Sequence, residues 1–156
     1  MAHIHEKIDF TVSIYIVHEG KVLLHKHRVL GIWLPPGGHI ELDEDPNEAA
    51  IREAKEETGL DVALIGESKS HDSPYNAREL IPPRFLGRHF YDESHTHEHV
   101  DLCFFARSLS NVNEARHEVE GGEMRWFGKE EINDPSIDIV PDVRHHVLTA
   151  LEEVQA

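Results

Sequence analysis

Runs of apolar residues predict most of the strands. Residues 10–17, FTVSIYIV, are rich in β-branched and aromatic side chains, and residues 21–27, KVLLHKH, follow after a short HEG turn, so the two predict a β-hairpin. The Gly- and Pro-rich residues 31–42 predict a short strand and a tightly shaped loop. Further strands are predicted at 61–68, 85–91, 99–107 and 122–127. Two polar stretches, 70–84 and 110–122, predict long loops, and loops of that length are often functional.

Capping signals predict one helix over residues 46–58. Asp45 is a good N-cap, Pro46 suits the first helical position, and Glu48 stands where a capping box needs it. Gly59 is placed to end the helix in a left-handed conformation. We expect the helix to pack through Ala50, Ile51 and Ala54.

A second helix is predicted at 141–154, where Val143, Val147, Leu148 and Leu151 form an inward apolar face. Strands interleaved with two helices favour an α/β or α+β fold with a mixed sheet. No repeat or linker divides the sequence, so we expect a single domain over residues 1–156.

The charge balance narrows the choice of partners. Thirty acidic residues against 15 basic ones give a net charge of −15, with 14 histidines counted as neutral. Such a surface repels nucleic-acid phosphates, and no basic stripe offsets it, so we expect no stable nucleic-acid binding. An acidic protein can still handle a small phosphorylated molecule if metal cations lie between the two.

The apolar runs and the cysteine count indicate the cellular compartment. No apolar run is long enough to cross a bilayer, and the first residues lack a signal-peptide pattern, so we expect no membrane association. Cys103 is the single cysteine, which excludes an intrachain disulfide within the sequence. A reducing, cytoplasmic setting is the simplest interpretation.

A cluster of glutamates lies on the helix at 46–58. Glu53, Glu56 and Glu57 stand at i, i+3 and i+4, so their carboxylates share one helical face. Hard cations such as Mg²⁺ and Mn²⁺ prefer these ligands, whereas a solvated charged face usually carries neutralising lysines that this cluster lacks. Arg52 can pair with a neighbouring carboxylate, and Glu44 can join the cluster if its loop folds back.

The same residues resemble a known family. Gly38, Glu44 and the run REAKEETGL at 52–60 match the Nudix box, GX5EX7REUXEEXGU, where U is bulky or aliphatic. The match, Gly38–Leu60, is long and chemically specific. WLPPGG before it and EMRWFGKEEI after it also resemble Nudix sequences. The resemblance implies a Nudix fold, a mixed sheet between helices.

The resemblance also implies an activity, which is hydrolysis of a nucleoside diphosphate linked to another group, with Mg²⁺ or Mn²⁺. Glu53, Glu56 and Glu57 would bind the metal with the Gly37 carbonyl, while Glu44 would assist and Arg52 would orient the carboxylates. A nucleotide sensor without turnover is the alternative, but a pure sensor has no need for every metal glutamate. Dimers are common in the family, although no segment here specifies an interface.

The general base is open at this stage. Glu53 and Glu56 are the candidates inside the box, and some Nudix enzymes use a glutamate from a distant loop instead. The second long loop offers Glu118, Glu120 and Glu123, of which we choose Glu120, although a solvated loop charge is the commoner use of such a residue.

Substrate contacts are assigned from position and chemistry. Gly38 lets the backbone approach a ligand, His39 is placed to contact a phosphate, and Tyr75 and Phe85 are placed to stack on a base. Pro74 resembles the family pattern of ADP-ribose hydrolases and Tyr75 that of dinucleoside-polyphosphate hydrolases, so the substrate stays open between these and a nucleoside triphosphate. Trp33 and Trp126 are more typical of a core.

A histidine-rich stretch adds a further hypothesis. His95, His97, His99 and Asp101 alternate, so in an extended segment they share one face. Such a face can bind zinc or copper, but a polar strand end or a wall of the substrate cleft is the more usual use.

Overall fold

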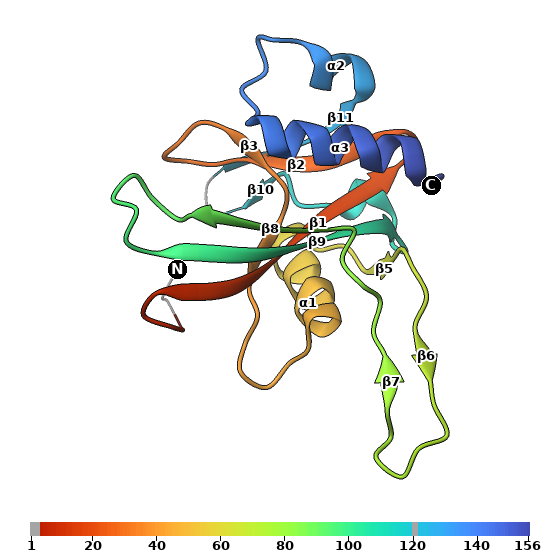
Figure 1. Ribbon diagram of the computed structural model, residues 1–156. Helices are drawn as coiled ribbons and strands as arrows, with labels where there is room; N and C mark the ends of the chain where they lie inside the picture. Colours follow the sequence, from red (N-terminus) through yellow and green to blue (C-terminus); the bar gives the residue numbers. More distant parts are fainter. Residues whose placement is uncertain (1–3, 120–121) are drawn as a thin grey trace.

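A mixed sheet forms the centre of the protein. The computed structural model describes residues 4–119 and 122–156. The predicted hairpin is present as β1 (Ile8–His18) and β2 (Lys21–Lys26), and β1 also runs parallel to β9 (Glu98–Ser108). The remaining pairings of the sheet are antiparallel, so β1 and β9 make it mixed (Figure 1).

The strands extend outward from this parallel pair in the order β10-β11-β2-β1-β9-β5. Three further strands attach to the path, because β3 pairs with β2, β4 with β1 and β8 with β9. Their bounds are β3 Trp33–Leu34, β4 Gly37–His39, β5 Val62–Leu64, β8 Phe85–Phe90, β10 Glu118–Val119 and β11 Gly122–Gly128.

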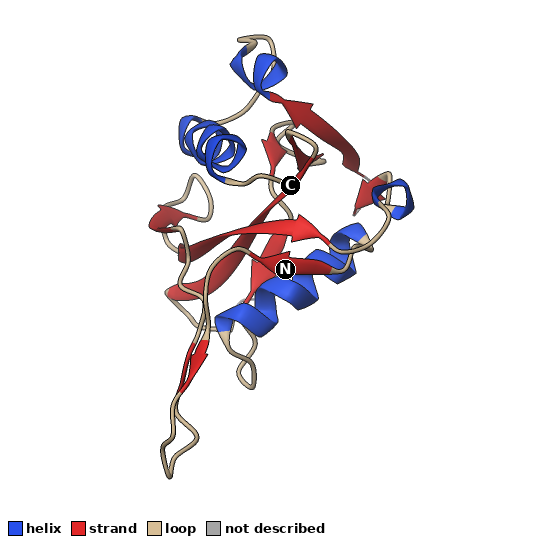
Figure 2. Cartoon of the chain, turned by 90° about the vertical axis from the view of Figure 1, so that its right-hand side faces the viewer, coloured by secondary structure: helices blue, strands red, loops and turns tan. Residues whose placement is uncertain are grey.

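Helices cover both faces of the sheet (Figure 2). Alternate residues of β1 point to opposite faces. Val12, Ile14 and Ile16 therefore pack in the core on the side of α1 (Pro46–Thr58). Tyr15 and Val17 pack in a second core under α3 (Pro141–Glu153). The expected sheet between helices is confirmed, and each face of the sheet carries its own core.

Helix α1 has the predicted bounds and caps. The Asp45 carboxylate accepts from the Glu48 N–H, the Glu48 side chain accepts from the Asp45 N–H, and Gly59 closes the helix at φ 77°. One packing expectation is wrong, since Ile51 is 46% exposed. The buried face of α1 is formed by Ala49, Ala50, Ala54 and Thr58, and Ile51 lies on the solvent side.

The C-terminal part also follows the predicted pattern. In α3, Val143 and Val147 are buried, and Leu148 and Leu151 pack against the same core from its edge. The short helix α2 (Lys129–Asn133) was not predicted, because five residues are too few to show a periodicity. Trp33 is buried beneath α3, in agreement with its expected core role.

The two stretches predicted as loops contain regular structure. In the first, β6 (Lys69–Ser70) and β7 (Arg78–Glu79) pair as a narrow ribbon that projects from the rest of the molecule (Figure 1). In the second lie a 3-10 turn at Val112–Glu114 and strand β10. Strand β5 is shorter than the predicted 61–68. Over the residues described, no helix is both long and apolar enough to cross a membrane.

Candidate functional site

Strand β4 brings a glycine backbone against the glutamate face of α1. Gly38 pairs with Val12 of β1, so its α-carbon points to the side of the sheet that α1 covers. A Cβ at Gly38 would lie 2.3 Å from Glu53 Oε1 and 2.6 Å from the carboxyl carbon. The carboxylate of Glu53 therefore occupies the space that any other residue at position 38 would fill.

Arg52 connects the carboxylates. Its Nε and Nη2 donate to the two oxygens of Glu44, so the loop before α1 does fold back toward the helix. Its Nη1 donates to Glu53 Oε1 at 2.8 Å and to Glu56 Oε2 at 3.1 Å. Nη2 also donates to the His39 carbonyl oxygen at 3.0 Å, which ties the guanidinium to β4. One cation thus fixes the orientation of three carboxylates relative to the sheet.

Glu57 makes the second link between helix and strand. Its Oε2 accepts a hydrogen bond of 3.0 Å from the Gly37 N–H. Gly37 itself lies so close to β1 that a Cβ there would be 2.1 Å from the Val12 carbonyl oxygen. The adjacent glycines have different roles, because Gly38 makes room for a carboxylate and Gly37 makes room for the main chain of β1.

The electrostatics of the cluster are those of an incompletely neutralised acidic site. The hydrogen bonds from Arg52 lower the pKa of the Glu44 carboxyl, whereas burial raises the pKa of Glu53 although the same guanidinium opposes it. The Glu53 side chain is 12% exposed and that of Glu56 is 60% exposed. Three carboxylates share the Arg52 guanidinium, so negative charge remains for a divalent cation to neutralise.

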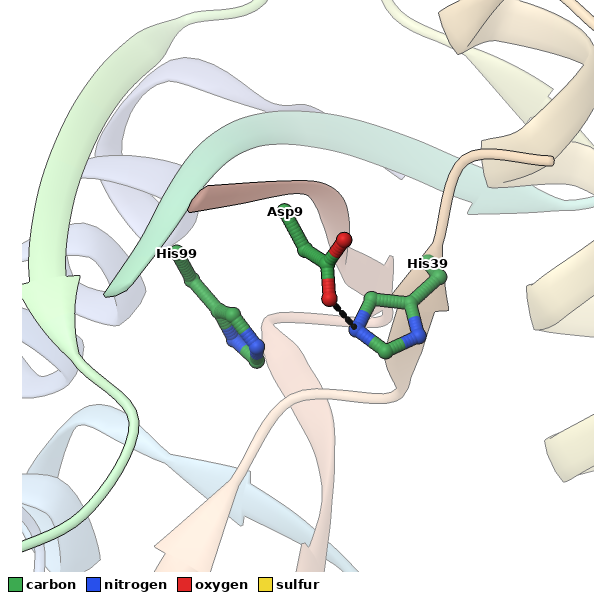
Figure 3. Close-up of side chains that lie close together, drawn as sticks. All are labelled: Asp9, His39 and His99. Atoms are coloured by element: carbon green, nitrogen blue, oxygen red, sulfur yellow. Dashed lines mark ion pairs between the residues drawn. The ribbon is translucent and has the colours of Figure 1, made fainter. Parts of the chain in front are cut away.

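His39, predicted to contact a phosphate, turns its ring away from the box glutamates. It is opposite Thr11 in the β1–β4 pairing, one position along from Gly38, so its side chain projects to the other face of the sheet. There its Nε2 lies 3.3 Å from Asp9 Oδ2 (Figure 3). Its main-chain carbonyl, by contrast, is at the box and accepts from Arg52.

The structure does not bring the two predicted stacking residues together. Tyr75 is 90% exposed and lies between β6 and β7, in the ribbon that projects from the body. Phe85 stacks on His146 of α3 with 4.2 Å between ring centroids, and it packs in the core beneath that helix. Phe85 therefore contributes to the core under α3. Its place in a predicted strand did not indicate this packing role.

The expected histidine face of 95, 97, 99 and 101 is only partly present. His95 precedes β9 in a turn at φ 56° and stacks on Phe90. His97 is buried, with Nε2 3.1 Å from Asp9 Oδ2, and His99 follows within β9. Asp101 lies further along, where it accepts from the hydroxyls of Thr11 and Ser13. The extended segment begins too late in the chain to include His95.

A general base from the second long loop stays a prediction. Glu120, the chosen candidate, lies outside the described residues. Glu123 is exposed on β11. Cys103 is buried in β9, and burial raises the pKa of its thiol well above the usual range.

An apolar cavity of about 380 Å³ opens beside the box loop. Its lining includes Phe10 and Leu102 from the sheet and, from the box loop and the start of α1, Ile40, Leu42 and Pro46. Neither Tyr75 nor Phe85 belongs to that lining. The cavity is of the size that small-molecule sites have, and it lies at the N-terminal end of the helix that carries the glutamates.

Sequence reasoning missed Asp9. The predicted strand began at residue 10, yet β1 begins at Ile8, and Asp9 is fully buried on the face that carries Tyr15 and Val17. An acidic residue in phase with buried apolar residues of a strand is unusual, because burying an unpaired charge is costly. The place of Asp9 on the same strand face as these apolar residues was the signal that could have identified it.

Comparison with known proteins gives consistent matches. The NUDIX domain family model matches residues 7–148. An RNA pyrophosphohydrolase of Roseobacter denitrificans is 30% identical over 142 residues, which cover 86% of this chain and 84% of that protein. A crystal structure of a NUDIX-family hydrolase from Clostridium perfringens has 33% identity and a TM-score of 0.80, with 94% of this chain and 98% of that chain covered.

Some relatives are much longer than the matched region. An m7GpppN-mRNA hydrolase NUDT17 of Xenopus laevis is 62% identical over 117 residues, which cover 66% of this chain and 40% of that protein. This chain therefore spans less than half the length of that relative.

Proposed function

The chain belongs to the Nudix family of pyrophosphohydrolases, and we propose that it hydrolyses a pyrophosphate bond in a nucleotide with Mg²⁺ or Mn²⁺ held by Glu53, Glu56 and Glu57. The observation that carries the proposal is the contact between helix and strand. Gly38 leaves room for the Glu53 carboxylate, Gly37 donates to Glu57, and Arg52 holds Glu44, Glu53 and Glu56.

The residues of the box fit a hard divalent cation. The proposed donors are the carboxylate oxygens of the three glutamates together with the Gly37 carbonyl oxygen, and Mg²⁺ and Mn²⁺ prefer such oxygen ligands. The space left by Gly38 allows the Glu53 carboxylate to lie against the sheet, and a larger residue at position 38 would displace it. Bound there, the cation supplies neutralisation of the pyrophosphate charge and a lower pKa for an attacking water.

The protein's own residues supply orientation and proton transfer. Arg52 restricts the rotamers of Glu44, Glu53 and Glu56 by direct hydrogen bonds. We assign removal of the water proton to Glu56, because its side chain is 60% exposed and accessible to water. Glu53, whose carboxylate is packed against Gly38, is assigned to metal binding and not to proton transfer.

The substrate class follows from charge and from the relatives. The relatives named above are called an RNA pyrophosphohydrolase and an m7GpppN-mRNA hydrolase, and a CTP pyrophosphohydrolase of Escherichia coli is 31% identical over 102 residues. All three names refer to nucleotide-linked phosphoanhydrides. The net charge of −15 disfavours contact with a long phosphate backbone, so we propose a small nucleotide as the substrate.

A substrate panel tests the proposal. The protein is incubated with Mg²⁺ and, separately, with CTP, ADP-ribose, a dinucleoside polyphosphate, a 5′-triphosphorylated oligonucleotide and a capped oligonucleotide, and the products are identified by chromatography. We expect a free nucleotide to be cleaved at its anhydride, and Glu56→Gln to lower kcat/KM by about 10³-fold. Tight nucleotide binding without any cleavage would support the sensor alternative and contradict the proposal.

A further inference from the structure

Three potential metal ligands meet on the sheet face opposite α1. Asp9 of β1, His39 of β4 and His99 of β9 come from three adjacent strands (Figure 3). Asp9 is opposite His99 in the parallel β1–β9 pairing, and His39 is opposite Thr11 in the β1–β4 pairing. One ligand atom from each residue lies within 4.8 Å of the other two. The sheet pairing thus holds all three side chains at one place.

We propose that Asp9, His39 and His99 form a binding site for a first-row divalent transition-metal ion, separate from the carboxylates of the Nudix box. The Asp9 Oδ2 to His39 Nε2 separation is 3.3 Å. Ligands at about 2.1 Å from a tetrahedral metal ion stand about 3.4 Å apart, so this pair already has the required spacing. His99 is the most exposed of the three, and its ligand atom also lies within 4.8 Å of the other two.

The donor set selects the kind of ion. Imidazole nitrogen suits zinc, copper, iron and nickel, whereas Mg²⁺ prefers an all-oxygen environment. Two histidines and one carboxylate leave further coordination positions for water or for an oxygen of another molecule. The box glutamates, which offer oxygens alone, would bind the hard ions, so the two sites would differ in the metal that each prefers.

A second layer of contacts orients the carboxylate. Asp9 Oδ1 accepts from the main-chain N–H groups of Ile4 and His5, at 3.1 and 2.7 Å. His97 lies against Oδ2 with its Nε2 and against the Glu6 carbonyl oxygen with its Nδ1. Supporting hydrogen bonds of this kind hold ligands in place and tune their affinity for a metal.

His39 links the proposed transition-metal site to the Nudix box through its ring and its main chain. Its ring lies at Asp9, and its carbonyl oxygen accepts from Arg52 on the other side of the strand. A metal on the histidine side would therefore fix the short strand that also carries Gly37 and Gly38.

Metal binding by the untagged protein tests the proposal. Zn²⁺ affinity is measured by competition with a chromophoric chelator, with excess Mg²⁺ present to fill the box, and Co²⁺ is added separately to record visible d–d absorption. We expect one Zn²⁺ per chain and a Co²⁺ spectrum typical of mixed nitrogen and oxygen ligands. His99→Ala should weaken Zn²⁺ binding by about 100-fold or more, because it removes a direct ligand.

Two control variants separate this site from others. His95→Ala removes an exposed ring that stacks on Phe90, and it should leave Zn²⁺ affinity unchanged. Glu53→Gln with Glu57→Gln disables the box and should also retain Zn²⁺ binding. Absence of Zn²⁺ binding by the wild type, full binding by His99→Ala, or loss of binding in the box variant would each overturn the proposal.

A folding failure of His99→Ala would not leave the question open. In that case the Co²⁺ spectrum of the wild type decides, because a site of the box type gives only the weak absorption of six oxygen ligands. Strong absorption supports the histidine site, and weak absorption contradicts it.

Discussion

Substituting Gly38 by alanine would test how closely the sheet approaches the glutamates. The added Cβ would lie 2.3 Å from Glu53 Oε1 and 2.6 Å from its carboxyl carbon. Because ordinary contacts begin near 3.4 Å, the carboxylate must retreat by about 1 Å. The change therefore moves a proposed metal ligand without removing it.

The expected cost is catalytic and not structural. A displacement of about 1 Å at a reacting site costs roughly 10²-fold in rate, which corresponds to about 2.7 kcal/mol of transition-state stabilisation. The clash involves the end of a side chain that can rotate, so the fold should absorb it. We expect Gly38→Ala to keep the wild-type thermal midpoint within about 3 °C, equivalent to about 1 kcal/mol.

The assay compares kcat/KM on the best substrate of the panel with Mn²⁺ affinity measured by electron paramagnetic resonance. Both should fall in Gly38→Ala. Gly87→Ala is the matched control, since a Cβ at Gly87 meets nothing within 4 Å, and it should behave as the wild type. Unchanged activity and unchanged Mn²⁺ affinity in Gly38→Ala would refute the claim that the glycine serves to seat Glu53.

Three further predictions concern the supporting structure. Asp45→Ala removes the N-cap of α1 and its contact with Arg78, so thermal unfolding should show a loss of about 1 kcal/mol, or about 2–4 °C, and no loss would contradict the role of the cap. Asn47→Ala removes both hydrogen bonds to the main chain of Ile81, so amide exchange should speed up in the β6–β7 ribbon but not in β1. Arg52 lowers the pKa of Glu44, so this contact stabilises the fold above the ordinary pKa of about 4.3 and is lost as the pH falls below it. In a chelator, Glu44→Gln should therefore destabilise the protein more at pH 7 than at pH 3, and an equal effect at both would contradict the assignment.

Local signals predicted the box helix to the residue. Asp45, Pro46, Glu48 and Gly59 each act within a few residues of the chain, so their effect can be read without knowing the fold. The sequence left open whether the loop of Glu44 folds back, and the structure shows Glu44 paired with Arg52. These contacts involve residues close together in sequence.

Long-range contacts set the limit of the sequence analysis. The ring of Phe85 stacks on His146 of α3, 61 residues later in the chain, and nothing near position 85 signals that contact. The side of β4 to which His39 points depends on its register with β1, which decides between the phosphate role expected for it and the contact with Asp9. The ribbon at 69–79 was missed because its paired strands have two residues each.

The most direct test of the central claim is metal-dependent hydrolysis by the wild type and by Glu53→Gln, with His71→Gln as an exposed control on the ribbon. We expect the wild type and His71→Gln to cleave a nucleotide with Mg²⁺ or Mn²⁺ and to lose all activity in excess chelator. Glu53→Gln should lose most of kcat/KM and should need a higher concentration of metal. Cleavage that persists in chelator, or full activity in Glu53→Gln, would contradict the assignment of the glutamates as the metal site.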